Sequence, residues 1–214
     1  MPPKPLILSF DTSAAHCAAA LLLGNTVLSE RIEPMHKGQA ERLFPLLEQI
    51  LAENGKHWSD LDAIGVCIGP GNFTGVRISV AAARGLALSL DIPAVGISKL
   101  EAMAYGTKGR VSAALDARRE RIYMQSFDNG QALDTPHMVA LLDVYDRLEA
   151  DEAVRVVADE ALDVPNVQAV DRLVVAVGHL AMERHDQKQP RPAPLYLRSA
   201  DAAPPSDPAI VILP

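Results

Sequence analysis

The feature that most constrains the fold is a glycine-rich stretch, residues 69–77 (Gly-Pro-Gly-Asn-Phe-Thr-Gly-Val-Arg), which separates two runs of different character. The run before it, Ala63 to Ile68, has the length and apolar composition of a buried strand. The run after it, Ile78 to Leu90, is rich in alanine and contains no proline, as is typical of a helix. The sequence therefore predicts a strand, a glycine turn and a helix in succession, with Thr74 as the helix N-cap.

Two interpretations of this turn stay open at the level of sequence. Glycine accepts backbone angles that a side chain forbids, and it lets a ligand or another segment approach the backbone closely. Many parallel-sheet proteins, however, simply turn from strand to helix on glycines. The turn is not a P-loop, because no Gly-Lys-Ser/Thr follows it.

Composition limits what kind of protein this is. The chain has 214 residues, 49% of them apolar, which is enough for one large domain or two small ones. Twenty basic and 27 acidic residues give a net charge of −7, which argues against a protein that grips nucleic acid by itself. Cys17 and Cys67 lie in separate apolar runs, which predicts buried reduced thiols and a cytoplasmic location. We expect no signal peptide and no membrane span, because no apolar run reaches about 18 residues.

The first half of the chain predicts a sheet with flanking helices. Helix periodicity places Leu43, Leu46 and Leu47 on one stripe, and Pro45 within that helix predicts a kink or a late start. The expected strands are Leu6–Phe10, Cys17–Leu23, Thr26–Ile32, Ala63–Ile68 and Ala94–Ile97, and the expected helices are Gln39–Asn54, Ile78–Leu90 and Ser98–Tyr105.

The second half begins where the chain changes character at Gly106–Gly109. We expect subdomains at residues 1–105 and 106–198, followed by an Ala- and Pro-rich tail at 199–214. The predicted strands of the second half are Val111–Leu115, Arg121–Phe127 and Val154–Ala158, and its predicted helices are Met138–Leu148 and Leu173–Ala181.

A weak internal repeat links the two halves. An apolar strand, an aspartate, a short polar turn and a second strand occur at Asp11 and again at Asp116. Matching run lengths around both aspartates imply a duplicated α/β domain with a cleft between the copies.

Four motifs carry a resemblance to a known family. Residues 8–13 (Leu-Ser-Phe-Asp-Thr-Ser), 69–77, 115–118 (Leu-Asp-Ala-Arg) and 194–198 (Pro-Leu-Tyr-Leu-Arg) resemble, in order and spacing, the bacterial TsaB (YeaZ) family. Asn72 stands where that family usually has Ser. The resemblance implies the duplicated ribonuclease H-like fold of the actin, sugar-kinase and Hsp70 (ASKHA) superfamily, an α/β fold of two mixed-sheet subdomains flanked by helices.

The resemblance also implies a function. Members of this family belong to the machinery that forms N6-threonylcarbamoyladenosine (t6A) at position 37 of tRNAs reading ANN codons. They pair with the related catalytic subunit TsaD, the ATPase TsaE joins them, and tRNA is contacted through the complex. On this expectation the chain is no enzyme by itself, has no cofactor of its own because ATP or metal sits on TsaD or TsaE, and homodimerises when alone.

Two sets of candidate residues follow from the resemblance. The first is a vestigial nucleotide-like cleft, formed by Asp11, Thr12, Ser13, Asp116 and Arg118. The second is a partner interface on the helices after the third and fourth strands. It comprises Glu41, Arg42, Leu46, Gly71, Phe73, Thr74, Gly75, Arg77, Ile78, Ala81, Ala82 and Gly85.

The catalytic relative holds its metal on a His-x-x-x-His motif, and the corresponding positions here are Lys99 and Met103. Neither side chain suits a hard divalent metal, and the six histidines contain no i, i+4 pair. Arg118, Arg119 and Arg121 form a basic cluster that is either a solvated turn or a contact for tRNA phosphate or an acidic partner. The alternative function is a stand-alone small kinase or ATPase that uses Asp11 and Asp116; a peptidase ranks last.

Overall fold

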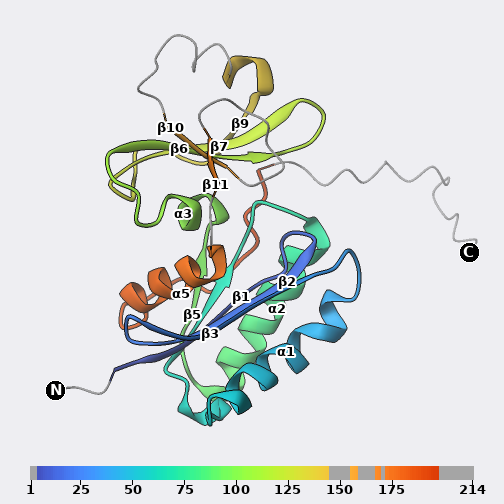
Figure 1. The fold of residues 1–214 in the computed structure, drawn as a ribbon, viewed down its shortest axis with the longest axis vertical. Coiled ribbons are helices and arrows are strands. Elements are labelled where there is room, and N and C mark those ends of the chain that lie inside the picture. Colours follow the sequence, from blue (N-terminus) through green and yellow to red (C-terminus); the bar gives the residue numbers. More distant parts are fainter. Residues whose placement is uncertain (1–3, 145–154, 159–166, 170–171, 198–214) are drawn as a thin grey trace, which may run out of the picture.

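A computed structural model describes residues 4–144, 155–158, 167–169 and 172–197. The predicted tail at 199–214 lies outside this range. Figure 1 shows two lobes, each built on its own sheet. The first sheet has the order β3-β2-β1-β4-β5, with strands β1 (Leu6–Asp11), β2 (His16–Leu23), β3 (Thr26–Pro34), β4 (Ala63–Cys67) and β5 (Ala94–Ile97).

The second sheet repeats this topology. Strand β6 pairs antiparallel with β7 and parallel with β10, as β1 pairs with β2 and β4, and the duplicated fold is therefore confirmed. Its order is β11-β10-β6-β7-β8, with β9 also on β7. The strands are β6 (Arg110–Asp116), β7 (Arg121–Asp128), β8 (Gln131–Ala132), β9 (His137–Ala140), β10 (Arg155–Ala158) and β11 (Val167–Ala169).

Helices cover both faces of the first sheet. Helices α1 (Gln39–Glu53) and α2 (Phe73–Leu90) pack on the face that carries Leu8 and Phe10. Helix α5 (Leu173–Arg184) packs on the opposite face, against Ile7 and Ala63. Alternate residues of β1 thus enter two different cores, as the two-residue period of a strand requires. Figure 1 shows α5 across the sheet from α1 and α2.

The late helix α5 therefore belongs to the first lobe, which comprises the β1–β5 sheet with α1, α2 and α5. The short helix α3 (Lys99–Ala104) instead packs on the second sheet, where Leu100 and Met103 meet Val111 and Phe127. An ion pair between Arg184 and Glu101 joins α5 to α3. A 3₁₀ turn at Trp58–Asp60 leads into β4.

One local prediction holds in part and another was wrong. Helix α1 begins at Gln39 with Pro45 inside it, so the proline causes no late start, and the kink that was the other expectation stays a prediction. Met138 lies in strand β9 rather than in a helix, because residues 137–140 pair antiparallel with β7. Helical backbone begins only at residue 141, and most of the predicted Met138–Leu148 helix lies outside the described residues. Sheet hydrogen bonds have here overridden the local helical period.

Candidate functional site

The glycine turn packs against the turn that follows β1. Strands β1 and β4 are parallel neighbours, so both turns leave the same edge of the first sheet. The backbone amide of Asn72 donates to the Ser13 carbonyl at 2.7 Å, and the Thr12 hydroxyl donates to the Gly75 carbonyl at 2.6 Å. A Cβ on Gly75 would overlap the Thr12 carbonyl oxygen, and one on Gly71 would overlap that of Ser13. Of the two interpretations left open, the structure supports a close approach to the glycine backbone. The approaching segment is the turn after β1 of the same chain.

The start of α2 differs from the prediction. Asn72 is the N-cap, because its side-chain oxygen accepts the Gly75 amide at 2.9 Å. The helix then begins at Phe73, and Thr74 is an exposed residue of its first turn. Thr74 as N-cap was therefore wrong; asparagine is at least as good a cap as threonine.

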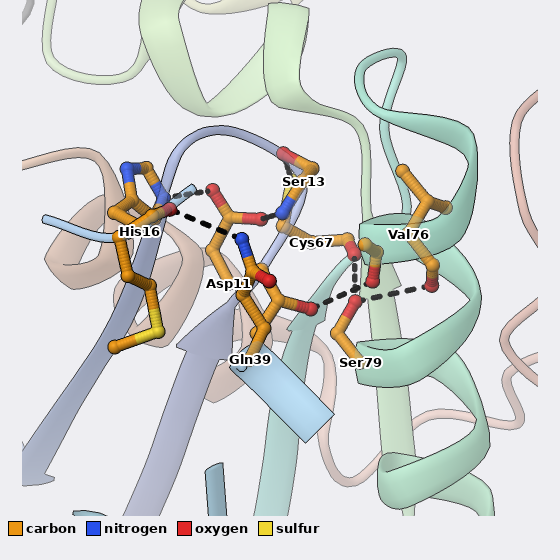
Figure 2. A network of polar contacts seen from close by, with 10 residues as sticks. Asp11, Ser13, His16, Gln39, Cys67, Val76 and Ser79 are labelled. Carbon is orange, nitrogen blue, oxygen red and sulfur yellow. Dashed lines mark hydrogen bonds and ion pairs between the residues drawn. The ribbon is translucent and has the colours of Figure 1, made fainter. Parts of the chain in front are cut away.

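Asp11 lies at the end of β1 with no exposed surface. One carboxylate oxygen accepts the Ser13 amide at 2.7 Å, and the other lies 3.0 Å from Nε2 of His16 (Figure 2). Burial raises the pKa of Asp11, but the hydrogen bond and charge of His16, the charge of Lys99 and the Ser13 amide lower it to about 2. The carboxylate is thus ionised, and each of its oxygens already has a partner within the chain.

The same network ties this turn to its neighbours. Figure 2 shows Ser79 of α2 hydrogen-bonded to the carbonyl oxygens of Cys67 and Val76, at 3.3 and 3.1 Å. On the other side, the Gln39 side chain at the start of α1 donates to the Met35 carbonyl at 3.1 Å. Ser79 thus ties α2 to the end of β4, and the Met35 backbone amide, which donates to the Ala15 carbonyl at 2.9 Å, ties the segment before α1 to the turn after β1.

The second aspartate repeats the first in its backbone but not in its surroundings. One oxygen of Asp116 accepts the Arg118 amide at 2.7 Å, which is the bond that Asp11 makes with Ser13. Asp116 and Arg118 are exposed, however, whereas Asp11, Thr12 and Ser13 are buried. Arg118, Arg119 and Glu120 all have left-handed backbone, with φ between 55° and 61°. The predicted cleft residues therefore lie in two different turns. The turn at Asp11–Ser13 is buried, and the turn at Asp116–Arg118 is exposed.

The positions that match the metal ligands of the catalytic relative are both buried. Lys99 and Met103 lie in α3, and the Lys99 amide donates to the Gly69 carbonyl at 2.7 Å. The Lys99 ammonium lowers the pKa of Asp11 from this position. Within the described ranges, no three His, Cys, Asp or Glu side chains gather as a metal ion would require.

Both cysteines are buried and free. Burial, with a contribution from the charge of Glu33, raises the pKa of Cys17 to about 11, and burial and the charge of Asp11 raise that of Cys67. Both thiols are therefore protonated at neutral pH, as expected of inert core cysteines.

The outward side of α2 carries a stripe of exposed residues that we call the docking face. Its members follow the three- and four-residue spacing of one helix face, and Leu88 is 83% exposed. A Cβ on Gly85 would meet open space. By length and apolar composition alone α2 is long enough to cross a membrane, but Val76, Val80 and Ala83 of its inward side are buried in the first lobe. The docking face consists of Thr74, Arg77, Ala81, Arg84, Gly85 and Leu88.

The predicted interface residues are not all on the surface. Leu46 is fully buried in the core and Gly75 is buried beneath Thr12, so neither can contact a partner. Arg42 is half-buried, and two 2.6 Å bonds hold it to Glu33. Ile78 and Ala82 are half-buried, whereas Glu41, Gly71, Phe73, Thr74, Arg77, Ala81 and Gly85 are exposed.

Residues 190–197, which we call the strap, were expected to form an extended segment that packs in part at Leu195–Leu197, but sequence reasoning did not identify what they contact. The Leu195 amide donates to the Ile68 carbonyl at 2.8 Å, beside the glycine turn. Tyr196 stacks on Phe73 with ring centroids 4.9 Å apart. The Pro-Leu-Tyr-Leu motif was visible in the sequence, but its contact lies more than 100 residues away along the chain.

Known proteins resemble this chain in sequence. The family model described as "TsaD: tRNA N6-adenosine threonylcarbamoyltransferase" matches residues 26–187. The "tRNA threonylcarbamoyladenosine biosynthesis protein TsaB" of Escherichia coli is 35% identical over 130 residues, which cover 58% of this chain and 56% of that protein. The match thus spans little more than half the length of that relative. An uncharacterized protein of Mycobacterium tuberculosis is 31% identical over 202 residues, covering 92% of this chain and 94% of that one.

Solved structures agree with the sequence matches. YeaZ from Pseudomonas aeruginosa has a TM-score of 0.69 and 26% identity, covering 90% of this chain and all of that one. The polyphosphate/ATP-glucomannokinase of an Arthrobacter strain has a TM-score of 0.52 at 10% identity, covering 84% of this chain and 99% of that one, which is a likeness of fold alone. The chain therefore has the expected actin-like and sugar-kinase fold.

Proposed function

Because the chain belongs to the TsaB (YeaZ) family, we propose that it is a non-catalytic subunit of the bacterial machinery that forms t6A in tRNA. In this role it pairs with TsaD, recruits the ATPase TsaE and contacts tRNA through the complex. The modified nucleoside lies at position 37 of tRNAs that read ANN codons. The TsaB relatives are named as t6A biosynthesis proteins, which supports this assignment.

The observation that carries the proposal is the docking face. Its small residues, Ala81 and Gly85, leave room for a second helix to approach the backbone of α2 closely. Leu88 and Phe44 add exposed apolar surface on α2 and α1. Exposed apolar surface of this kind marks an interaction site. Docking there holds TsaD in its active shape, and the same face supports a homodimer when TsaD is missing.

The surroundings of the two aspartates support a role without catalysis. A carboxylate that arranges metal and phosphates needs free oxygens, whereas both oxygens of Asp11 have partners within the chain. The carbonyls of Thr12 and Ser13 fill the space above Gly75 and Gly71 that a phosphate would need. We therefore assign ATP and metal to TsaD and TsaE. The alternative, a stand-alone kinase or ATPase, requires the buried turn at Asp11–Ser13 to open. The buried thiols suit a cytoplasmic location.

The test is a substitution on the docking face. Ala81→Arg places a long charged side chain on the exposed stripe, whereas Ala82 is half-buried and packs against the core. We expect the variant to fold normally, to fail to co-purify with TsaD from the same organism, and to lose tRNA modification in the reconstituted system. Ala132→Arg, at an exposed position of β8 in the second lobe, is the matched control and should keep both. Full modification by Ala81→Arg would reject the docking face.

Calorimetry with ATP and Mg²⁺ separates the two functions. The subunit proposal expects no micromolar binding and no turnover by the isolated chain. Both together would favour the stand-alone enzyme.

A further inference from the structure

A compact cluster of aromatic rings and an arginine lies at the N-terminal end of the docking face. The guanidinium carbon of Arg77 lies 3.7 Å from the ring centroid of Phe73. Its Nε donates to the hydroxyl of Tyr196 at 2.7 Å, and the two rings stack on each other. Phe73 is 38% exposed and Tyr196 is 44% exposed, although aromatic residues make up only 4% of the chain. Such a concentration on the surface indicates a binding site rather than a core feature.

The strap keeps Tyr196 in place. Leu195, its neighbour, is bonded to the Ile68 carbonyl, and Pro192 packs against Gly96 of β5. Leu197 packs against the core of the second lobe. The residues on either side of Tyr196 are therefore held, Leu195 by the segment after β4 and Leu197 by the core of the second lobe.

These contacts fix the orientation of Arg77. A free arginine on a surface samples many rotamers, and ordering them on binding costs affinity. Here the Phe73 ring covers one face of the guanidinium and Tyr196 accepts from Nε, so the plane of the group is set in advance. The Nη edge of a guanidinium held in this way fits a carboxylate through two parallel hydrogen bonds.

The charge of α2 indicates the sign of the partner. Between Phe73 and Leu90 the helix contains no Asp or Glu, and its charged residues are Arg77 and Arg84, both exposed. This cationic face belongs to a chain with a net charge of −7. A second copy on this face has to be offset so that its arginines avoid those of the first, whereas an acidic partner surface complements the face directly.

We propose that Arg77, held by Phe73 and positioned by Tyr196, is the anchor of the docking face and binds a carboxylate on the surface of TsaD. This inference rests on the proposed function and specifies the chemistry of that interface. Phe73 provides the apolar floor of the anchor, and the strap couples its geometry to the C-terminal part of the chain.

The experiment measures the affinity of the full chain for TsaD by calorimetry. Arg77→Lys keeps the charge but loses the planar fork and its stacking, and it should weaken binding about tenfold or more. Arg110→Lys, at an exposed position of β6 away from α2, is the matched control and should stay within about twofold of the wild type. Tyr196→Phe removes only the hydroxyl and should weaken binding about threefold or more. A merely structural tyrosine would act independently of Arg77, whereas a positioning tyrosine should have no further effect in the Arg77→Lys background.

The outcomes separate this inference from the function beneath it. Wild-type chain that fails to bind TsaD at all overturns the proposed function and the anchor with it. Wild-type chain that binds, with Arg77→Lys equally tight, overturns the anchor alone. Sedimentation velocity tests the second copy as occupant: loss of self-association in Arg77→Lys with unchanged affinity for TsaD would also overturn the proposal.

Discussion

The buried negative charge of Asp11 is stabilised by neighbouring groups of the protein rather than by solvent. Its carboxylate has no exposed surface, yet its pKa is lowered from 3.8 to about 2. The Ser13 amide and His16 are close partners, and the Lys99 ammonium adds a third favourable contribution. The sequence predicted Asp11 as a strand-end aspartate, but it gave no sign that His16 would turn back onto it.

The folded-state pKa of Asp11 lies below its unfolded value, so ionisation stabilises the fold above about pH 4. That contribution is lost as the pH falls from about 4 toward 2. The shift of nearly two units corresponds to about 2 kcal/mol. We expect Asp11→Asn to lower the free energy of unfolding at pH 7 by about that amount and to flatten its dependence on pH below 4. Urea unfolding followed by circular dichroism measures both.

Asp116→Asn is the matched control, because Asp116 makes the same backbone bond at an exposed turn. It should change the free energy of unfolding by no more than about 0.5 kcal/mol. Equal effects of the two substitutions would contradict this account of Asp11.

At the scale of elements, the strand, the glycine turn and the helix were predicted because each has a strong local signal. The short apolar run, the three glycines and the alanine-rich run need no distant partner to be recognised. What fills the space beside the glycines is a contact with residues about 60 positions earlier, so no local pattern contains it. The same reason explains β9, whose strand character comes from pairing with β7.

Two glycines of α2 give opposite predictions for one substitution. Gly75→Ala should destabilise the fold by about 3 kcal/mol or more, because the new methyl group would overlap the Thr12 carbonyl and force the two turns apart. Gly85→Ala should stabilise the fold by about 0.5–1 kcal/mol, because its side has open space and alanine favours a helix. Thermal and urea unfolding of the two variants tests this. Similar values for both would show that the turns do not interlock.

At the scale of the whole molecule, the duplication could be predicted but the path of the chain could not. Two aspartates after similar strands were enough to indicate two similar sheets. The division at 105/106 stays a prediction, and the chain crosses it: α5 covers the first sheet while α3 packs on the second. The apolar stripe of α5 shows that it is buried, but a stripe does not say against which sheet.

This crossing predicts how the molecule unfolds. Val177 of α5 is fully buried against the first sheet, so Val177→Asn should cost about 3 kcal/mol. The single tryptophan, Trp58, packs against the opposite core of that sheet and reports on the first lobe. We expect its fluorescence midpoint and the far-ultraviolet dichroism midpoint to fall together. Leu133→Asn, at an exposed loop position, should leave both unchanged. An unchanged Trp58 midpoint in Val177→Asn would mean that α5 does not support the first sheet.

The position of α5 also has a consequence for synthesis on the ribosome. Strand β5 ends at Ile97, but the helix that covers the face of Ile7 and Ala63 ends at Arg184. At 5–20 residues per second, roughly 5–20 seconds of translation separate the two. During that interval the nascent chain carries one side of its central sheet bare, which is the kind of surface that chaperones recognise. The strands that are synthesised first therefore keep one face uncovered until α5 has been synthesised.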